Sequence, residues 1–367
     1  MKKNILNILI FSIIILWSFL LFQIQLIYWK FLAPIFWWSS SVWTTSILFF
    51  QIFLFFWYLY SFLINKLSIK KQLFIHFFIL LITFTLVIYI YINNGNFVLQ
   101  KSILNQIDFL SPTSSLMYIL ITTIWLQYFI LSTTSSLYQN WYHKIHKKEP
   151  FWLYKWSNFS SVIALISYPI FEIFFPINIH WNIWWILLIF TIFIQFIFIL
   201  FMYLVLNKKS KIKIICDKSK SQNIYIHKTS ITHILLWLLY SIIPVVFLLS
   251  VWTKISMEYT SIPFLWMVLL SIYLISFILW FHKWLYKRES ALPISVILIF
   301  IFIIIGYFID ITSVLLIYII FLGYIWFICH WELFNLRPNP HNTTFYYLII
   351  SIWGIIWWII VNIISPI

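Results

Sequence analysis

The sequence is poor in the residues from which soluble enzymes build phosphate-binding loops and acid–base sites. It contains four glycines, eight acidic residues and two cysteines in 367 residues. It has no glycine-rich nucleotide loop, no G-x-S-x-G nucleophile motif and no H-E-x-x-H zinc motif. Cys216 and Cys329 are too few for a disulfide framework or a four-cysteine metal site. These absences count against nucleotide-dependent enzymes, serine hydrolases and metalloproteases, and we expect neither a cofactor nor a metal.

The abundant residues are apolar and aromatic. Hydrophobic residues make up 64% of the chain, charged residues make up 8%, and the mean hydropathy is +1.01. Such a chain has too little polar surface to cover a soluble globule. The composition therefore predicts an all-α fold, a multi-pass bundle of transmembrane helices.

Apolar runs recur along the sequence, and each is long enough to cross a hydrocarbon core roughly 30 Å thick. The first run follows two lysines, but it is too long for a signal peptide. Gln23 and Gln25 stand where a cleavage site would need small residues, so we expect a retained helix. About eleven helices are predicted, at residues 5–27, 43–64, 73–92, 115–137, 159–176, 184–206, 231–251, 261–281, 292–309, 311–329 and 344–364.

The basic residues are distributed unevenly between the two sides of this predicted bundle. If each helix reverses the chain direction, only Lys30, Lys101 and Lys254 of the 23 basic residues fall on the side opposite the N-terminus. Cytoplasmic loops of membrane proteins carry the excess of lysine and arginine. The pattern therefore predicts a cytoplasmic N-terminus in a cell (inner) membrane.

The net charge of +15 has a simple explanation in this topology. Basic loops lie against the anionic inner leaflet, so we expect the lipid bilayer, and not nucleic acid, to be the partner. The most basic segment, residues 207–230, is predicted to be a cytoplasmic linker. It separates a first transmembrane block of about six helices, residues 1–206, from a second of about five, residues 231–367.

His330 and Glu332 in the string CHWEL are the first candidates for function. Charged groups at membrane depth are costly and often mark functional sites. The pair could form a proton or substrate site or provide two metal ligands, but two ligands are a weak metal signal. A polar cluster at a helix end is the simpler interpretation.

Two further acids are candidates. Glu258, in KISMEYTSIP, is expected in a short outer loop, where it is either functional or simply solvated. Glu172 lies near an outer helix end between Pro169 and Pro176, where a broken helix could line a cavity.

Four stretches of the chain resemble one family when taken in order. They begin LLFQIQLIYWKFLAPIFWW, FILSTTSSLYQNWYHK, TKISMEYTSIPFLW and CHWELFNLRPNP, and they span most of residues 21–367. The last is similar to CHGELARLRPAP, and the second to FFLLSTTAPLLQRWF. Together they resemble the membrane region of the bacterial integral-membrane spermidine synthase-like proteins, also described as fused transporter-like/spermidine synthase proteins.

The resemblance implies that catalysis belongs to a domain separate from the membrane region. In that family a soluble domain of methyltransferase type follows the membrane region and would transfer an aminopropyl group from decarboxylated S-adenosylmethionine to a polyamine. The present sequence ends at Ile367 without such a domain, so a truncated reading frame is one expectation. The chain alone is then a non-catalytic module that handles or senses a small cationic or amphiphilic substrate. A separately encoded spermidine synthase-like domain would be its partner.

The resemblance also bears on individual residues. His330, Glu332 and Glu258 match family positions that hold His, Glu and Asp, although the roles of those positions do not follow from the match. Arg337 stands in the matching RP, where it would contact either lipid phosphate or substrate.

Two alternatives come from other functional classes. A stand-alone secondary transporter of major-facilitator-like organisation fits two helical blocks joined by a basic linker. A membrane acyl- or glycosyltransferase would use His330 and Glu332 as acid and base.

Tryptophan replaces glycine at several positions of the family pattern, where a large indole would force close-packed helices apart. Glycine is about 1% of the chain against an ordinary share of roughly 7%, whereas 23 residues are tryptophan. We hypothesise an organism that reads UGA as glycine; a tryptophan-rich protein with aromatic belts is the alternative. The candidate recoded positions are Trp37, Trp38, Trp57, Trp331, Trp353, Trp357 and Trp358. At Trp43, Trp141 and Trp266 the family itself has tryptophan.

Overall fold

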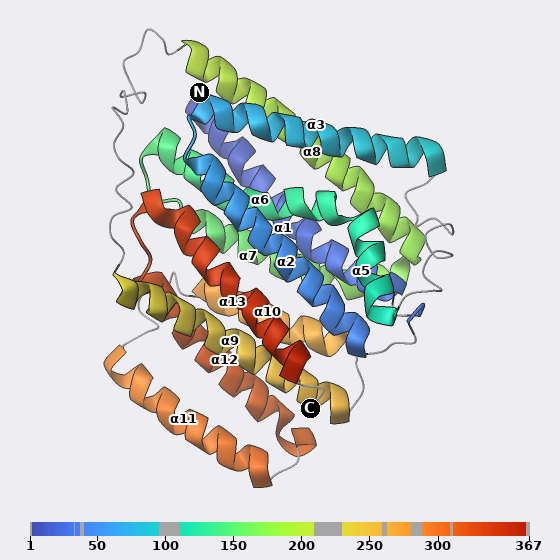
Figure 1. The fold of residues 1–367 in the computed structure, drawn as a ribbon. Helices are drawn as coiled ribbons and strands as arrows, with labels where there is room; N and C mark the ends of the chain where they lie inside the picture. Colours follow the sequence, from blue (N-terminus) through green and yellow to red (C-terminus); the bar gives the residue numbers. More distant parts are fainter. Residues whose placement is uncertain are drawn as a thin grey trace.

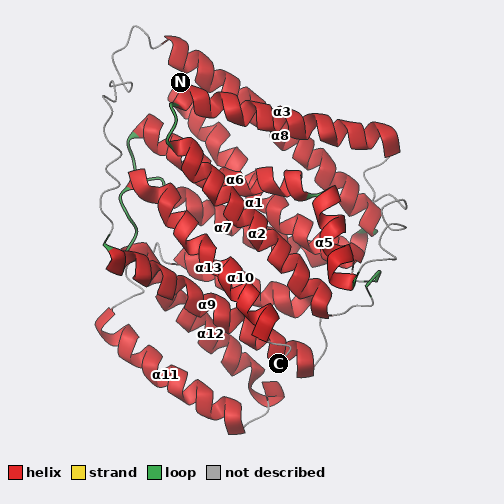
Figure 2. Cartoon of the chain, in the orientation of Figure 1, coloured by secondary structure: helices red, strands yellow, loops and turns green. Residues whose placement is uncertain are grey.

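The computed structural model is a bundle of helices (Figure 1), described here for residues 2–32, 34–36, 40–94, 111–208, 230–258, 263–279, 288–308 and 311–364. No strand occurs within these ranges, which confirms the all-α prediction (Figure 2). The helices are α1 (Lys2–Leu32), α2 (Ser40–Asn65), α3 (Ile69–Asn94), α5 (Pro112–Thr123), α6 (Trp125–His146), α7 (Trp152–Phe174), α8 (Ile177–Lys208), α9 (Ile231–Glu258), α10 (Pro263–Leu279), α11 (Arg288–Phe308), α12 (Ile311–Asn335) and α13 (Thr343–Ile364), with a 3-10 turn at Pro340–Asn342.

Several of these helices are long and apolar enough to cross a membrane. Six satisfy both conditions in the described part of the chain, and the bent pair α5–α6 makes a seventh if it is one span. The six spans are Asn4–Leu32, Thr45–Asn65, Ile69–Ile92, Trp152–Phe174, Ile177–Asn207 and Ile231–Trp252. This agrees with a multi-pass membrane protein, whereas the count of eleven spans and the orientation of the N-terminus stay predictions.

The break between α5 and α6 was not expected, because a single span had been predicted at 115–137. The two helices meet at an angle of 69° around Ile124. Before the break, the Thr122 hydroxyl donates to the Tyr118 carbonyl at 2.8 Å, and the Thr123 hydroxyl donates to the Ile119 carbonyl at 2.6 Å. Such bonds from threonine to the preceding turn compete with the helical ladder and bend helices.

The connection after α6 is also shorter than expected. The interval 138–158 was predicted to lie between spans, but α6 continues to His146 and α7 begins at Trp152. Lys147 ends α6 with a left-handed backbone, φ 55°, and its N–H donates to the His143 carbonyl at 2.8 Å. The helices therefore extend beyond their apolar runs into polar sequence.

The helices pack according to a scheme that occurs twice. In the N-terminal part, α1 contacts α6 and α7, and α2 contacts α6. In the C-terminal part, α9 contacts α12 and α13, and α10 contacts α12. The contacts α2–α13 and α7–α10 join the two sets, while α3 and α11 lie at opposite edges of the bundle (Figure 1).

Small residues allow α1 and α7 to approach closely. The Ser18 and Ser157 hydroxyls lie 2.6 Å apart, and the Ser160 hydroxyl donates to the Ile15 carbonyl at 2.7 Å. On the same face, the Gln23 amide donates to the Ala164 carbonyl at 2.9 Å. Small side chains at helix interfaces bring backbones together in membrane proteins, and hydroxyl groups add hydrogen bonds between the helices.

Candidate functional site

A cavity of about 290 Å³ lies in the middle of the bundle, where the N-terminal and C-terminal helices meet. Its walls come from α1, α2, α6 and α7 on one side and from α9, α10, α12 and α13 on the other. The polar side chains among its lining residues are those of Ser18, Gln25, Gln51, Tyr58, Tyr128, Ser132, Tyr154, Ser157, Asn158, Ser161, Ser241, Tyr273, Tyr346, Tyr347 and Ser351. The volume is at the lower end of the range for small-molecule sites, which run from roughly 300 to 1,000 Å³.

A polar stripe on α7 forms one wall of this cavity. Ser157 and Ser161 are four residues apart and Asn158 lies between them, so a helix places all three on one face. All three side chains are buried. The Asn158 Nδ2 group makes no hydrogen bond within the described part of the chain. The Asn158 side chain also interacts with that of Tyr154, so the two polar groups lie together in the cavity wall.

Aromatic rings from both sets of helices form another wall. Tyr58 of α2 stacks on Tyr347 of α13 with ring centroids 5.8 Å apart. Tyr154 of α7 contacts Tyr347 at 5.7 Å and Phe277 of α10, edge to face, at 5.5 Å. The Tyr347 hydroxyl donates to Gln139 Oε1 of α6 at 3.1 Å. The aromatic wall therefore bridges the two sets of helices.

The cavity contains no ionisable acid or base among the described residues that line it, tyrosine apart. A buried charge without a partner is strongly unfavourable. The walls instead offer hydroxyl groups, amides and aromatic rings. This set suits a molecule with a few hydrogen-bonding groups and an apolar body.

His330 lies behind this cavity and does not line it. Its side chain is fully buried, and its ring stacks on Phe277 with centroids 3.5 Å apart and meets Tyr273 edge to face at 4.7 Å. His330 Nδ1 is 2.6 Å from the Ser276 hydroxyl, while Nε2 has no hydrogen-bond partner in the described residues. Both Phe277 and Tyr273 do line the cavity, so the histidine supports its aromatic wall.

Glu332 lies two residues after His330, near the end of α12. It is 1% exposed and does not line the cavity. Within the described ranges, no three His, Cys, Asp or Glu side chains come together closely enough to hold a metal ion. The interpretation of the pair as two metal ligands therefore has no third ligand among these residues.

Arg337 makes contacts within the protein. Its guanidinium lies 3.9 Å from the centre of the Phe334 ring and 5.6 Å from that of Phe151. It also lies 3.4 Å from a Glu149 carboxylate oxygen and donates to the Phe334 carbonyl at 3.0 Å. These contacts join the end of α12 to the α6–α7 connection.

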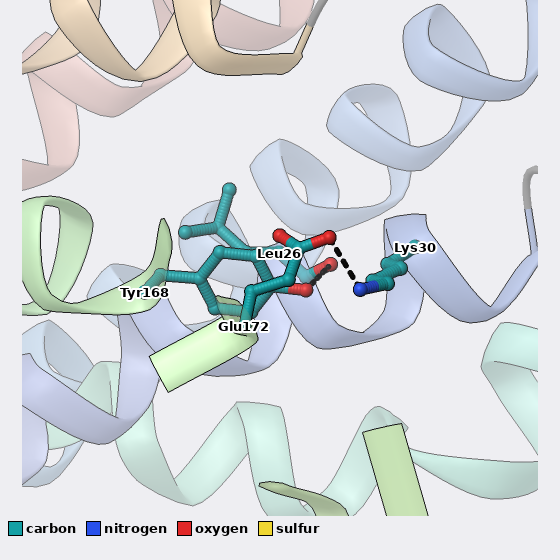
Figure 3. A network of polar contacts seen from close by, with 4 residues as sticks. All are labelled: Leu26, Lys30, Tyr168 and Glu172. Carbon is teal, nitrogen blue, oxygen red and sulfur yellow. Dashed lines mark hydrogen bonds and ion pairs between the residues drawn. The ribbon is translucent and has the colours of Figure 1, made fainter. Parts of the chain in front are cut away.

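Glu172 is not among the residues that line the central cavity. Glu172 pairs with Lys30 of α1, next to a hydrogen bond of 3.3 Å from the Tyr168 hydroxyl to the Leu26 carbonyl (Figure 3). Helix α7 continues through Pro169 and places the Glu172 carboxylate at Lys30, so the helix is not broken at that proline as expected. Glu258 is the last residue of α9 and not part of a loop, which corrects that prediction. The helix continues seven residues past its predicted end at 251.

Among the candidate recoded tryptophans, the structure describes the side-chain surroundings of Trp57 and Trp331. Trp57 is fully buried against Tyr60 and Phe129, with ring centroids 4.6 Å away in each case, and its indole N–H has no hydrogen-bond partner in the described residues. Trp331 is buried beside Phe327. By contrast, the Trp141 indole donates to Gln72 Oε1 at 2.8 Å. Trp353, Trp357 and Trp358 lie in α13 without described side chains, and Trp37 and Trp38 fall outside the described residues.

Gly354 shows how closely α13 approaches α2. A Cβ atom built at Gly354 would lie 2.7 Å from Gln51 Oε1, so even alanine would displace that amide. Trp358 follows four residues later, and glycine there would complete a small-x-x-x-small motif on this helix. Recoding would therefore extend a close contact that Gly354 already makes.

We expect glycine at residues 57, 353, 357 and 358 when native peptides are sequenced by mass spectrometry. The physical reason is that small residues at helix interfaces permit close packing that indoles obstruct. Peptides covering residue 141 provide the control, because that indole is hydrogen-bonded and should be tryptophan. Tryptophan at residue 57 as well as at 357 and 358 would refute recoding.

Sequence reasoning missed most of the residues that build the cavity, and it missed a buried polar network that joins α3, α6 and α8. In that network His76 Nε2 of α3 lies 3.2 Å from Gln195 Oε1 of α8, which also accepts from the Tyr138 hydroxyl at 3.0 Å. These are single polar residues in apolar helices, so they form no motif. The serines at 157, 160 and 161 were the available signal, because they recur on one helical face.

Similarity to known proteins gives no further guide to the function. Comparisons with protein families, with curated proteins and with solved structures found no match. The geometry of the cavity and the arrangement of the helices around it therefore carry the functional argument.

Proposed function

We propose that the protein is a membrane module that binds a small molecule in the central cavity and exposes it alternately to the two sides of a cell membrane. In this proposal residues 1–206 and 231–367 are two helical blocks joined by the linker 207–230. The N-terminus is cytoplasmic and about eleven helices cross the bilayer. One observation carries the proposal: the cavity lies where two sets of helices with the same packing scheme meet.

The repeated scheme supports alternating access for a physical reason. Secondary transporters are commonly built from structural repeats, with the substrate site at the repeat interface. Rocking one repeat against the other then opens the site to either side. Here the interface is formed mainly by the α2–α13 and α7–α10 contacts, and both helices of each pair line the cavity.

Contacts at one end of this interface suggest which side is closed. The Asn65 amide donates to the Thr344 hydroxyl at 3.3 Å where α2 ends and α13 begins (Figure 1). Arg337 and Glu149 pair at the same end. In the proposed orientation this is the cytoplasmic end, so we assign the structure to a state closed toward the cytoplasm.

The lining favours an amphiphilic substrate over a polyamine. A polyamine carries several positive charges, and no described lining residue offers a carboxylate to pair with them. Hydroxyl groups, amides and aromatic rings suit a neutral or singly charged amphiphile, for which aromatic faces also attract a cation. The resemblance to spermidine synthase-like membrane regions then supports the architecture, with a separately encoded synthase-like domain as a possible partner.

Thiol labelling tests the proposal without knowledge of the substrate. In a background without Cys216 and Cys329, Gln25→Cys places one thiol in the cavity wall. We expect a membrane-impermeant maleimide to label it both in intact cells and in inside-out vesicles, because both states are visited. Ser61→Cys is the matched control, since Ser61 is fully buried between α2 and α6. Labelling of the cavity thiol from one side only would contradict alternating access.

A further inference from the structure

Helices α3 and α8 lie side by side at an edge of the bundle (Figure 1). Residues of both helices line a groove between them. It has a volume of about 640 Å³ and is separate from the central cavity. Its apolar walls are formed by Leu73, Phe74, Ile75, Phe77, Phe196, Ile199, Leu200 and Tyr203. Phe74 and Leu200, one from each helix, are more than half exposed. A groove of this kind is filled by lipid chains when the helices lie in a bilayer.

Positive charge is concentrated at one end of the groove. Lys70 and Lys71, in the first turn of α3, are exposed and line it. Lys70 Nζ donates to Asn207 Oδ1 at the end of α8 at 2.9 Å, an exposed contact between the two helices that form the groove. The described lining includes no acidic residue that would neutralise the pair. The groove therefore has two lysines at one end and apolar walls along its length.

This combination matches one class of molecule. A phosphate group suits the two ammonium groups, and an acyl chain suits the apolar walls. A headgroup that also carries an ammonium, as in phosphatidylcholine, would bring a positive charge close to the lysines. A water-soluble phosphate would leave the apolar channel without a partner.

We propose that the α3–α8 groove is a binding site for an anionic phospholipid, with its phosphate on Lys70 and Lys71 and an acyl chain between Phe74 and Leu200. The inference does not depend on the central cavity or on any tryptophan, because no tryptophan lines the groove. It assigns a particular position to one lipid, beyond the general attraction between basic loops and an anionic leaflet. The lipid would also fasten α3 to α8, next to the buried contact between His76 and Gln195.

Native mass spectrometry tests the site. The protein is reconstituted in nanodiscs with equal amounts of phosphatidylglycerol and phosphatidylcholine and then released from them. We expect retained phosphatidylglycerol to exceed retained phosphatidylcholine. The Lys70→Gln/Lys71→Gln variant should retain roughly ten to thirty times less phosphatidylglycerol than the unsubstituted protein. This is the factor expected from the attraction of about 1 kcal/mol per lysine to an anionic surface.

A second pair of lysines gives the matched control. Lys147→Gln/Lys148→Gln removes the same charge from exposed residues in the α6–α7 connection, and it should leave retention unchanged. Phe74→Ala/Leu200→Ala reduces the apolar surface that can contact an acyl chain and leaves both groove lysines in place. This variant should also retain less phosphatidylglycerol. Thermal unfolding of each variant in detergent verifies that it is folded.

Three results would overturn the proposal. The first is an equal loss of lipid in the control pair, which would indicate general electrostatic attraction. The second is equal retention of the two lipids. The third is displacement of phosphatidylglycerol by glycerol phosphate, which has the headgroup chemistry without the chains and would indicate a site for free phosphate.

Discussion

Oxidation of an Asn65→Cys/Thr344→Cys variant is expected to stop labelling of the cavity thiol from the cytoplasmic side. The two native side chains are 3.3 Å apart at the α2–α13 contact. A disulfide there would hold the two blocks together at the end that has to open toward the cytoplasm. We expect labelling of Gln25→Cys in inside-out vesicles to fall by about two orders of magnitude, since a locked equilibrium leaves the open state almost unpopulated. Labelling in intact cells should persist.

A cross-link within one block is the control, because it stiffens the protein without joining the two blocks. Ser61 of α2 and Ser136 of α6 have hydroxyl groups 2.9 Å apart. Oxidised Ser61→Cys/Ser136→Cys should therefore form a disulfide within the N-terminal block, yet leave labelling from both sides intact. Reduction of the disulfide between residues 65 and 344 should restore cytoplasmic labelling of the cavity thiol. Continued labelling of Gln25→Cys from the cytoplasmic side, with the disulfide between residues 65 and 344 fully formed, would show that the cavity does not open by movement of α2 against α13.

Replacing His330 with alanine is expected to have the largest effect on stability. The ring is fully buried and stacks on Phe277 at 3.5 Å. Truncating a buried aromatic side chain to alanine costs about 3–5 kcal/mol, because it leaves a cavity. His330→Ala should lower the free energy of unfolding by this amount, measured by titration with sodium dodecyl sulfate and circular dichroism.

His330→Phe is the informative companion variant. It keeps the stacked ring and removes the contact with the Ser276 hydroxyl, which still donates to the Tyr273 carbonyl at 2.6 Å. The loss should therefore be only about 1 kcal/mol, the usual net contribution of one hydrogen bond. Cavity labelling should be unchanged if the histidine supports the aromatic wall. A stable His330→Phe protein that has lost cavity labelling would instead assign the imidazole a chemical role.

Much of the fold could be predicted from the sequence, because long apolar runs define helices in a membrane protein. The helix ends were predicted less well. Polar residues such as Glu258 do not end a helix by themselves, and α9 continues to that residue without an apolar signal. The bend at Ile124 depends on hydroxyl groups bonding to particular carbonyls, which composition does not reveal.

The site could be predicted only in part. His330 was recognised as a polar residue at the end of a helix, but its partner Ser276 is 54 residues away in the sequence. Asn158 and Tyr347 become cavity residues only because α7 and α13 meet others at the centre. Such contacts between distant segments follow from packing, and no local pattern encodes them.

The close contact between α1 and α7 has a consequence for biosynthesis. Ser18 and Ser157 are separated by 139 residues, and Gln23 reaches Ala164 over 141. At a ribosomal rate of roughly 5–20 residues per second, α1 waits on the order of ten seconds before its partner has been made. During that time the Ser18 hydroxyl can donate to the Ile14 carbonyl of its own helix, whereas the Gln23 amide needs another acceptor, from the translocation machinery or from lipid headgroups. Helix α1 therefore reaches its final surroundings well after it has been made, and α2, which contacts α13, waits longer still.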